Sequence, residues 1–210
     1  MQEVLQNAKS GDHIMNIRNE QELIALIQKD EWMVETLEAA ASLRLPDWWI
    51  CAGFVRSKIW DVQLGIPGRT PLPDVDVIYF DPSDLDEAVE KQLEARLRSI
   101  KLDVPWSVKN QARMHLLNAM PPYLSSEDAM SKFPETATAL GVSLAREGRI
   151  ILAAPHGLQD ALSLTIRPTP LFRDSHKLAA LYERRIAAKK WHETWKGLTI
   201  IHTNERQIRH

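Results

Sequence analysis

A chain of 210 residues has room for one domain, or for one domain with a small appendage. Its 44% hydrophobic and 26% charged residues are typical of a globular protein and exclude disordered, collagen-like and disulfide-scaffold chains. The 26 basic and 28 acidic residues nearly cancel, so a nucleic-acid partner stays open but is not favoured. The single cysteine, Cys51, fits a reducing compartment.

The hydropathy pattern contains no candidate export or membrane segment. Residues 1–11 lack an apolar core of signal-peptide length. The longest apolar runs, such as residues 150–154, are too short to span a bilayer. We therefore expect a cytoplasmic protein with no membrane partner.

Helical and strand patterns alternate along the chain. In chain order they predict helices at residues 19–41, 54–60, 85–99, 125–133, 157–164 and 174–195, and strands at residues 48–52, 74–81, 106–112, 139–145 and 149–153. Lys29 and Asp30 are a candidate break in the first helix. This alternation indicates an α/β or α+β protein. We expect an N-terminal helical segment at 1–47, a core at 48–170, and a C-terminal helix and tail at 171–210.

Two aspartates open the strand predicted at residues 74–81. Because side chains alternate between the faces of a strand, Asp74 and Asp76 project together while Val75 and Val77 point to the core. Neighbouring carboxylates repel each other, and a divalent cation removes that repulsion. Oxygen ligands suit Mg²⁺ or Mn²⁺, so the pair is a candidate metal site. The alternative is that both aspartates are solvated residues at the mouth of a strand.

The place of the pair within its strand separates two classes of phosphate-handling enzyme. In haloacid-dehalogenase-type phosphatases a hydrophobic strand precedes the Asp-x-Asp motif, whereas here the hydrophobic residues follow it. A glycine turn after a buried strand, upstream of such a pair, is instead the arrangement of nucleotidyltransferases. There the glycine lets a helix N-terminus approach the triphosphate, and the aspartates hold the metal ions. Gly53 occupies the glycine position in this chain.

Five motifs carry a resemblance to a known family. They are AGFVRSKIWD at residues 52–61, PDVDVIYFD at 73–81, WSVKNQARMH at 106–115, FPETAT at 133–138 and APHGLQD at 154–160. In this order they resemble the bacterial nucleotidyltransferase-like family, within the DNA-polymerase-beta-type nucleotidyltransferase superfamily. The resemblance covers more than half of the chain and implies a nucleotidyltransferase-type fold, a small mixed sheet flanked by helices. It also implies a nucleoside triphosphate (NTP) as substrate and Mg²⁺ or Mn²⁺ as cofactor.

The chain departs from the superfamily pattern in three features. Phe54, in place of a small residue, follows Gly53, and an inserted loop lengthens the gap to the aspartates. No third carboxylate is obvious, although that acid commonly deprotonates the attacking hydroxyl in the superfamily. Asp103 and Asn110 are the candidates for its place. We favour Asn110, which lies on the neighbouring strand, whereas Asp103 precedes Pro105 at the beginning of that strand.

Glycine and basic residues are expected at the nucleotide. The resemblance places Gly53 and Phe54 there, and Arg56, one turn later, can bind a phosphate through its bidentate guanidinium group. Lys109 and Arg113 share one face of their strand if it is regular, and can also bind phosphate. Each of these cations can instead pair with a nearby acid. The basic side of the C-terminal helix is expected to be solvated.

Together these features favour a metal-dependent nucleotidyltransferase that transfers a nucleoside monophosphate from an NTP to a hydroxyl acceptor. Asp74 and Asp76 would hold the metal ions, and the acceptor stays unknown. A second hypothesis is a weakly active or inactive nucleotide- and metal-binding protein that lacks the third acid. A third is a protein-interaction partner whose basic C-terminal helix is the contact surface.

Overall fold

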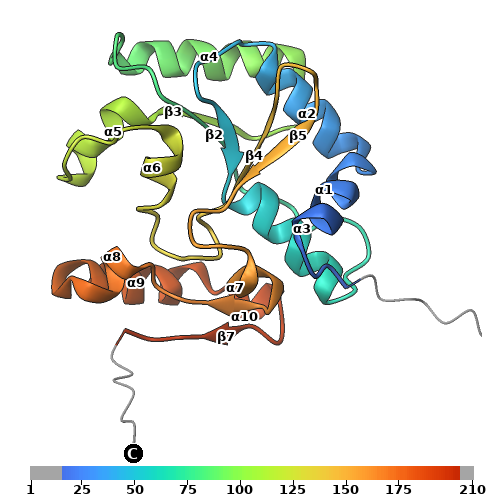
Figure 1. Ribbon diagram of the computed structural model, residues 1–210, viewed down its shortest axis with the longest axis vertical. Coiled ribbons are helices and arrows are strands. Elements are labelled where there is room, and N and C mark those ends of the chain that lie inside the picture. The colour runs from blue at the N-terminus through green and yellow to red at the C-terminus, as the bar shows by residue number, and fades with distance from the viewer. Residues whose placement is uncertain (1–15, 204–210) are drawn as a thin grey trace, which may run out of the picture.

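The computed structural model describes residues 16–203 (Figure 1). Residues 1–15, which begin the expected N-terminal segment and include residues 1–11, where we expect no signal peptide, lie outside the described residues. So do residues 204–210 of the expected tail. In the described part of the chain, no helix is long and apolar enough to cross a bilayer.

A five-stranded mixed sheet forms the centre of the fold (Figure 1). Its strands are β1 (Trp49–Cys51), β2 (Val75–Tyr79), β3 (Trp106–Asn110), β4 (Gly141–Leu144) and β5 (Ile150–Ala153). They lie in the order β3-β2-β1-β4-β5. β2 and β3 are parallel, and the other neighbours are antiparallel. The expected α/β class, a small mixed sheet flanked by helices, is confirmed.

The two faces of the sheet bury different clusters. Val75 and Val77 belong to the main core, together with apolar side chains of the C-terminal part and of the first four helices. These helices are α1 (Glu20–Gln28), α2 (Glu31–Ala41), α3 (Gly53–Gln63) and α4 (Glu87–Ile100). On the other face, Cys51 and Ile78 pack with Met130 of α6 (Ser126–Met130). Since Asp76 lies between Val75 and Val77 in the strand, its side chain shares this second face.

Capping side chains decide where the first helices begin. The side chain of Asn19 accepts a hydrogen bond from the backbone N–H of Glu22 at the start of α1. The side chain of Asp30 accepts one from the N–H of Met33 at the start of α2. The two caps explain why the helical pattern of residues 19–41 forms two helices, and the break expected at Lys29 and Asp30 is confirmed.

The strand expected at residues 106–112 ends earlier than predicted. β3 ends at Asn110, whose side chain accepts a hydrogen bond from the backbone N–H of Ala112. That bond caps α5 (Gln111–Asn118), a helix that the sequence pattern did not indicate. The expectation of strand structure through residue 112 is therefore wrong.

The C-terminal part forms a second layer beside the sheet (Figure 1). Its elements are α7 (Gln159–Leu162), β6 (Thr165–Ile166), α8 (Pro170–Asp174), α9 (His176–Lys189), α10 (Trp191–Thr194) and β7 (Thr199–Ile200). The single helix expected at 174–195 is wrong, because Lys190 has a left-handed backbone with φ 47° and ends α9. β7 pairs in parallel with β6, which ties the chain after α10 to the rest of this layer. The boundaries expected at residues 47 and 170 stay a prediction.

Candidate active site

The two aspartates lie where β2 begins. Asp76 pairs in register with Cys51 of β1 on one side and with Ser107 of β3 on the other. Asp76 is half-buried, and Asp74, just before the strand, is exposed. The intervening Val75 is completely buried in the main core. The strand thus holds the Asp76 carboxylate on the opposite side from the core, as its alternation predicts.

The electrostatics of the pair disfavour its full ionisation. Burial raises the pKa of Asp76, and the charge of Asp74 raises it further. The hydroxyl of Ser107 and the positive charges of Lys189 and Arg185 lower that pKa and only partly offset the increase. A divalent cation between the carboxylates would remove both the repulsion and the cost of burying charge.

The turn from β1 into α3 is strained. Ala52 has φ 53° and ψ −115°, a conformation that residues with a side chain rarely adopt. Its side chain makes no capping hydrogen bond at the start of α3. The N–H group of Ala52 donates to the carbonyl oxygen of Leu140 at 2.9 Å, whereas that of Gly53 has no hydrogen-bond partner among residues 16–203. The helix therefore begins with an uncapped N–H group at Gly53, a residue that lines a cavity. The N-terminus of a helix carries partial positive charge and favours a bound anion.

Arg56 is a buried cation in the first turn of α3. Only 7% of the residue is exposed, and its side chain has no hydrogen bond or ion pair with any residue in the range 16–203. The guanidinium carbon lies 4.9 Å from the centre of the Trp60 ring and 4.4 Å from that of Trp191. Burial lowers the pKa of Arg56 to about 10, and the charge of Glu135 opposes that shift. Arg56 is therefore charged at neutral pH, without a fixed anionic partner among residues 16–203.

The aspartates, the helix start and Arg56 border one cavity of about 300 Å³. Its walls are formed by Ala52, Gly53, Arg56, Ser57, Thr70, Pro71, Leu72, Pro73, Asp74, Asp76, Arg185, Lys189, Trp191, Thr194 and Trp195. Four of the residues expected at the site, Asp74, Asp76, Gly53 and Arg56, are thus brought together. The volume is at the lower end of the usual range for small-molecule sites.

The C-terminal layer forms one wall of the cavity, which the sequence analysis does not predict. Arg185 and Lys189 of α9 line the cavity, although we expected the basic side of this helix to be solvated. Tyr182 and Ile186 on the same helix are buried. Because residues three and four apart share a helix face, the stripe 182, 185, 186 and 189 was a usable signal that these cations face inward.

The loop at residues 63–73 is fixed against this layer by Asp61. The backbone N–H and the hydroxyl of Thr70 donate to the Asp61 carboxylate at 2.9 and 2.6 Å. Trp195 Nε1 donates to the same carboxylate at 2.8 Å. Asp61 thereby joins α3, the inserted loop and the chain after α10 into a continuous wall of the cavity.

Both candidates for the third acid lie elsewhere. The register of β2 and β3 places Asn110 beside Tyr79, at the opposite end of the strand from Asp76. The Asn110 amide donates to the carbonyl oxygens of Asp81 and Asp84 at 2.7 and 2.8 Å, so its role is structural. Asp103 accepts a hydrogen bond from Trp32 Nε1 at 2.8 Å, in contact with α2. The expected placement of either residue beside the aspartates is wrong.

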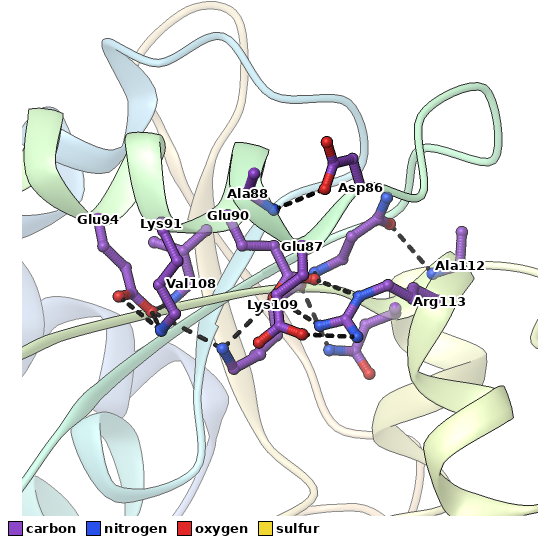
Figure 2. Close-up of polar contacts among 12 residues, drawn as sticks. Asp86, Glu87, Ala88, Glu90, Lys91, Glu94, Val108, Lys109, Ala112 and Arg113 are labelled. Carbon is purple, nitrogen blue, oxygen red and sulfur yellow. Dashed lines mark hydrogen bonds and ion pairs between the residues drawn. The ribbon is translucent and has the colours of Figure 1, made fainter.

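Lys109 and Arg113 also lie outside the cavity, in an ion-pair cluster that joins α4, β3 and α5 (Figure 2). Arg113 Nε and Nη2 donate to the fully buried carboxylate of Glu90 at 3.1 and 2.9 Å. Lys109 Nζ lies 3.4 Å from the same carboxylate. Lys109 and Arg113 therefore pair with acidic side chains, as the second of the two interpretations predicts, and do not line the cavity as phosphate-binding residues would.

Phe54 lies outside the cavity, whereas the expected metal ligands Asp74 and Asp76 line it. Phe54 is a core residue, 1% exposed, with its ring centre 5.8 Å from that of Trp32, and does not line the cavity. Within residues 16–203 no group of three or more His, Cys, Asp or Glu side chains is arranged to hold a metal ion. Asp74 and Asp76 are therefore the carboxylates that the cavity offers to a cation.

Comparisons with known proteins agree with this architecture. A family model described as nucleotidyltransferase matches residues 38–200. An NMR structure described as revealing a CCA-adding enzyme head domain is 35% identical, with a TM-score of 0.80, over 90% of this chain and 99% of that one. No curated protein matches the sequence.

Larger solved structures share the fold at lower identity. A CCA-adding enzyme in complex with CTP has a TM-score of 0.54 at 14% identity, and a Thermotoga maritima CCA-adding enzyme complexed with tRNA has 0.53 at 15%. Each alignment covers 90% of this chain but 44% of the enzyme, so the chain spans less than half of their length. From the family match and the head-domain similarity together, the chain belongs to the nucleotidyltransferase family.

Proposed function

We propose that this protein transfers a nucleoside monophosphate from an NTP to a hydroxyl acceptor, with a divalent cation bound by Asp74 and Asp76. The family and the head-domain similarity support nucleotidyl transfer in general. The finer proposal rests on one observation: the buried guanidinium group of Arg56 has no hydrogen-bond or ion-pair partner in residues 16–203 and borders the same cavity as two carboxylates.

The charges in the cavity select a particular kind of ligand. A buried cation without a partner costs several kcal/mol, and a bound anion would offset that cost. An anion alone would be repelled by Asp74 and Asp76. A triphosphate that carries a divalent cation satisfies both groups, because its phosphate oxygens can meet Arg56 while its cation meets the carboxylates.

The two carboxylates fit a magnesium ion. Mg²⁺ commonly binds to one or two protein carboxylates and completes its coordination with water and substrate phosphates. Asp74 and Asp76 provide such a pair, and the raised pKa of Asp76 is the change that a bound cation would reverse. When bound there, the cation would neutralise phosphate charge as the bond to pyrophosphate breaks.

The other cavity residues bind and orient the triphosphate in this proposal. Arg56 and the uncapped start of α3 bind phosphate oxygens, and Lys189 of α9 adds a positive charge. Trp191 and Trp195 exclude water from one side of the cavity. Attack by the acceptor hydroxyl on the α-phosphorus forms the new phosphate ester and releases pyrophosphate. The candidate acceptors are small molecules, protein side chains and RNA ends.

One observation favours a second candidate, a nucleotide-binding protein with weak or no turnover. The residue beside Asp76 on β3 is Ser107, and the sequence candidates for a third acid lie elsewhere. A serine hydroxyl is a far weaker base than a carboxylate at neutral pH. Binding would then survive while proton removal from the acceptor is slow.

Incubation of the protein with each of the four α-³²P-labelled NTPs and Mg²⁺ or Mn²⁺ distinguishes an active nucleotidyltransferase from a nucleotide-binding protein with weak or no turnover. The measurements are bound label, released pyrophosphate and label on an added acceptor. Pyrophosphate release with label on an added acceptor is the result we expect. Asp76→Asn should abolish it, and Asp103→Asn, the same chemical change outside the cavity, should leave it unchanged. Binding without pyrophosphate release would support the second candidate. Absence of both binding and release would contradict both.

A further inference from the structure

The motif FPETAT at residues 133–138 carries a buried carboxylate that the proposed chemistry does not use. Glu135 is completely buried, in the segment that joins α6 to β4. Its Oε1 accepts a hydrogen bond from Arg185 Nε at 2.7 Å, and its Oε2 accepts one from Thr138 Oγ1 at 2.8 Å. Both oxygens of the carboxylate therefore have a fixed partner.

The backbone around Glu135 is fixed as well. Its carbonyl oxygen accepts hydrogen bonds from the N–H groups of Thr138 and Ala139, each at 3.1 Å. The residue forms an isolated β-bridge with Pro168. A buried carboxylate on a segment held in this way has little freedom to move, so it can set the position of the group that it binds.

That group is the guanidinium of Arg185, which lines the cavity from α9. Glu135 binds its Nε, whereas Nη1 and Nη2 make no hydrogen bond with the described part of the chain. The side chain remains 37% exposed. A free arginine side chain samples many rotamers, and an arginine held at one edge loses less entropy when it binds a ligand.

We propose that Glu135 is a positioning residue: it holds Arg185 by its Nε so that both Nη groups are presented to a phosphate group in the cavity. The inference rests on the proposed function, because it assigns the ligand of Arg185 to the triphosphate. Glu135 itself does not line the cavity. The FPETAT segment would thus contribute to nucleotide binding through a residue of another element.

Two conservative variants separate position from charge. Glu135→Asp keeps the negative charge but is one methylene shorter, so it does not reach Arg185 Nε from the same backbone. Glu135→Gln keeps the length and an oxygen acceptor for Nε but removes the charge, and Thr138 can accept from its amide. Positioning predicts that the aspartate variant is the damaged one. A counter-ion role predicts the reverse.

Glu90 provides a matched control. It is another completely buried glutamate, and it binds Arg113 Nε and Nη2 in the cluster of Figure 2, outside the cavity. Glu90→Asp makes the same change to a buried glutamate–arginine pair. It reports the effect that loss of such a pair has on the fold alone.

The experiment measures binding of the α,β-methylene analogues of ATP, CTP, GTP and UTP, with Mg²⁺, by titration calorimetry, with thermal melting as the check on folding. For the analogue that the parent binds best, we expect Glu135→Asp to weaken affinity about tenfold, the loss of one charge-assisted hydrogen bond. Glu135→Gln and Glu90→Asp should stay within about threefold of the parent. In an Arg185→Gln background, Glu135→Asp should have no further effect.

Each other result contradicts the inference in an identifiable way. Unchanged affinity in Glu135→Asp, or a larger change in Glu135→Gln, would overturn the positioning role while leaving the proposed function standing. An equal loss in Glu135→Asp with and without Arg185 would show that the effect does not pass through that arginine. A parent that binds none of the four analogues would overturn the proposed function and this inference with it.

Discussion

Asp76 lines the cavity, and its ionisation carries a cost in stability. Its carboxylate is half-buried and beside Asp74, and both conditions raise its pKa. A raised pKa in the folded state means that ionisation destabilises the fold. The stability contributed by the protonated form is present below the unfolded pKa of about 4 and is lost as the pH rises through the folded pKa.

Asp76→Asn should therefore stabilise the protein without metal at neutral pH. We expect the variant to melt about 2–4 °C above the parent at pH 7.5, and the difference to vanish below about pH 4. Circular dichroism melts across this pH range in a chelating buffer test it. Added Mg²⁺ and nucleotide should then raise the melting temperature of the parent and not of the variant. A variant that melts below the parent at pH 7.5 would contradict the assignment.

Asn110 illustrates a residue whose role is the opposite of the one expected. Its side chain binds the backbone of Asp81 and Asp84 and caps α5. Asn110→Asp removes the two bonds that the amide donates and turns a carboxylate toward two carbonyl oxygens. We expect a loss of about 2–4 kcal/mol in the free energy of unfolding, measured by urea denaturation. Nucleotide affinity of the folded fraction should not change, and a gain in Mg²⁺ affinity would restore the earlier assignment.

The turn between β1 and α3 has a strained backbone at Ala52, a residue that also lines the cavity. Ala52 has a positive φ although it carries a side chain, and the next residue begins the helix that carries Arg56. Strain of this kind persists where the surrounding structure imposes it, and it concentrates at binding sites.

Ala52→Gly should relieve that strain. We expect a gain of about 1 kcal/mol in the free energy of unfolding, because glycine adopts positive φ without steric cost. Ala95→Gly, at an exposed position inside α4, is the matched control and should lose about 1 kcal/mol. Both are measured by urea denaturation. A loss of stability in Ala52→Gly would show that the alanine conformation is not strained.

Single elements also show what the sequence could and could not predict. The alternation of Asp74, Val75, Asp76 and Val77 predicts a strand with a polar and a buried face, because that property is local. The predicted position of Asn110 beside Asp76 is wrong because strand register depends on contacts between distant segments, here the parallel pairing of β2 and β3. The end of α9 at Lys190 follows from a left-handed backbone that helical periodicity does not reveal.

At the scale of the whole molecule, the cavity lies where the C-terminal layer meets the sheet layer. Asp74, Asp76 and Arg56 come from the sheet and the helix after it, and Arg185 and Trp191 come from α9 and α10. A net charge of −2 conceals this local grouping of cations around two carboxylates. The overall composition could therefore argue against long-range attraction of nucleic acid, but it could not predict which ligand one cavity binds.

Arg56 is buried and has no hydrogen-bond or ion-pair partner among residues 16–203, and we expect it to bind a phosphate group of the ligand. Arg56→Met removes the charge and keeps an apolar side chain between Trp60 and Trp191. Because an uncompensated buried charge is destabilising, the variant without ligand should melt no lower than the parent. Its loss should appear only in binding.

The most direct test is a calorimetric titration of parent and Arg56→Met with the α,β-methylene NTP analogues and Mg²⁺. We expect the parent to bind at least one analogue and Arg56→Met to bind it at least about thirtyfold more weakly, because the variant loses hydrogen bonds to a charged group. Equal affinity in a variant that melts like the parent would contradict this expectation, because the phosphate would then lie away from Arg56.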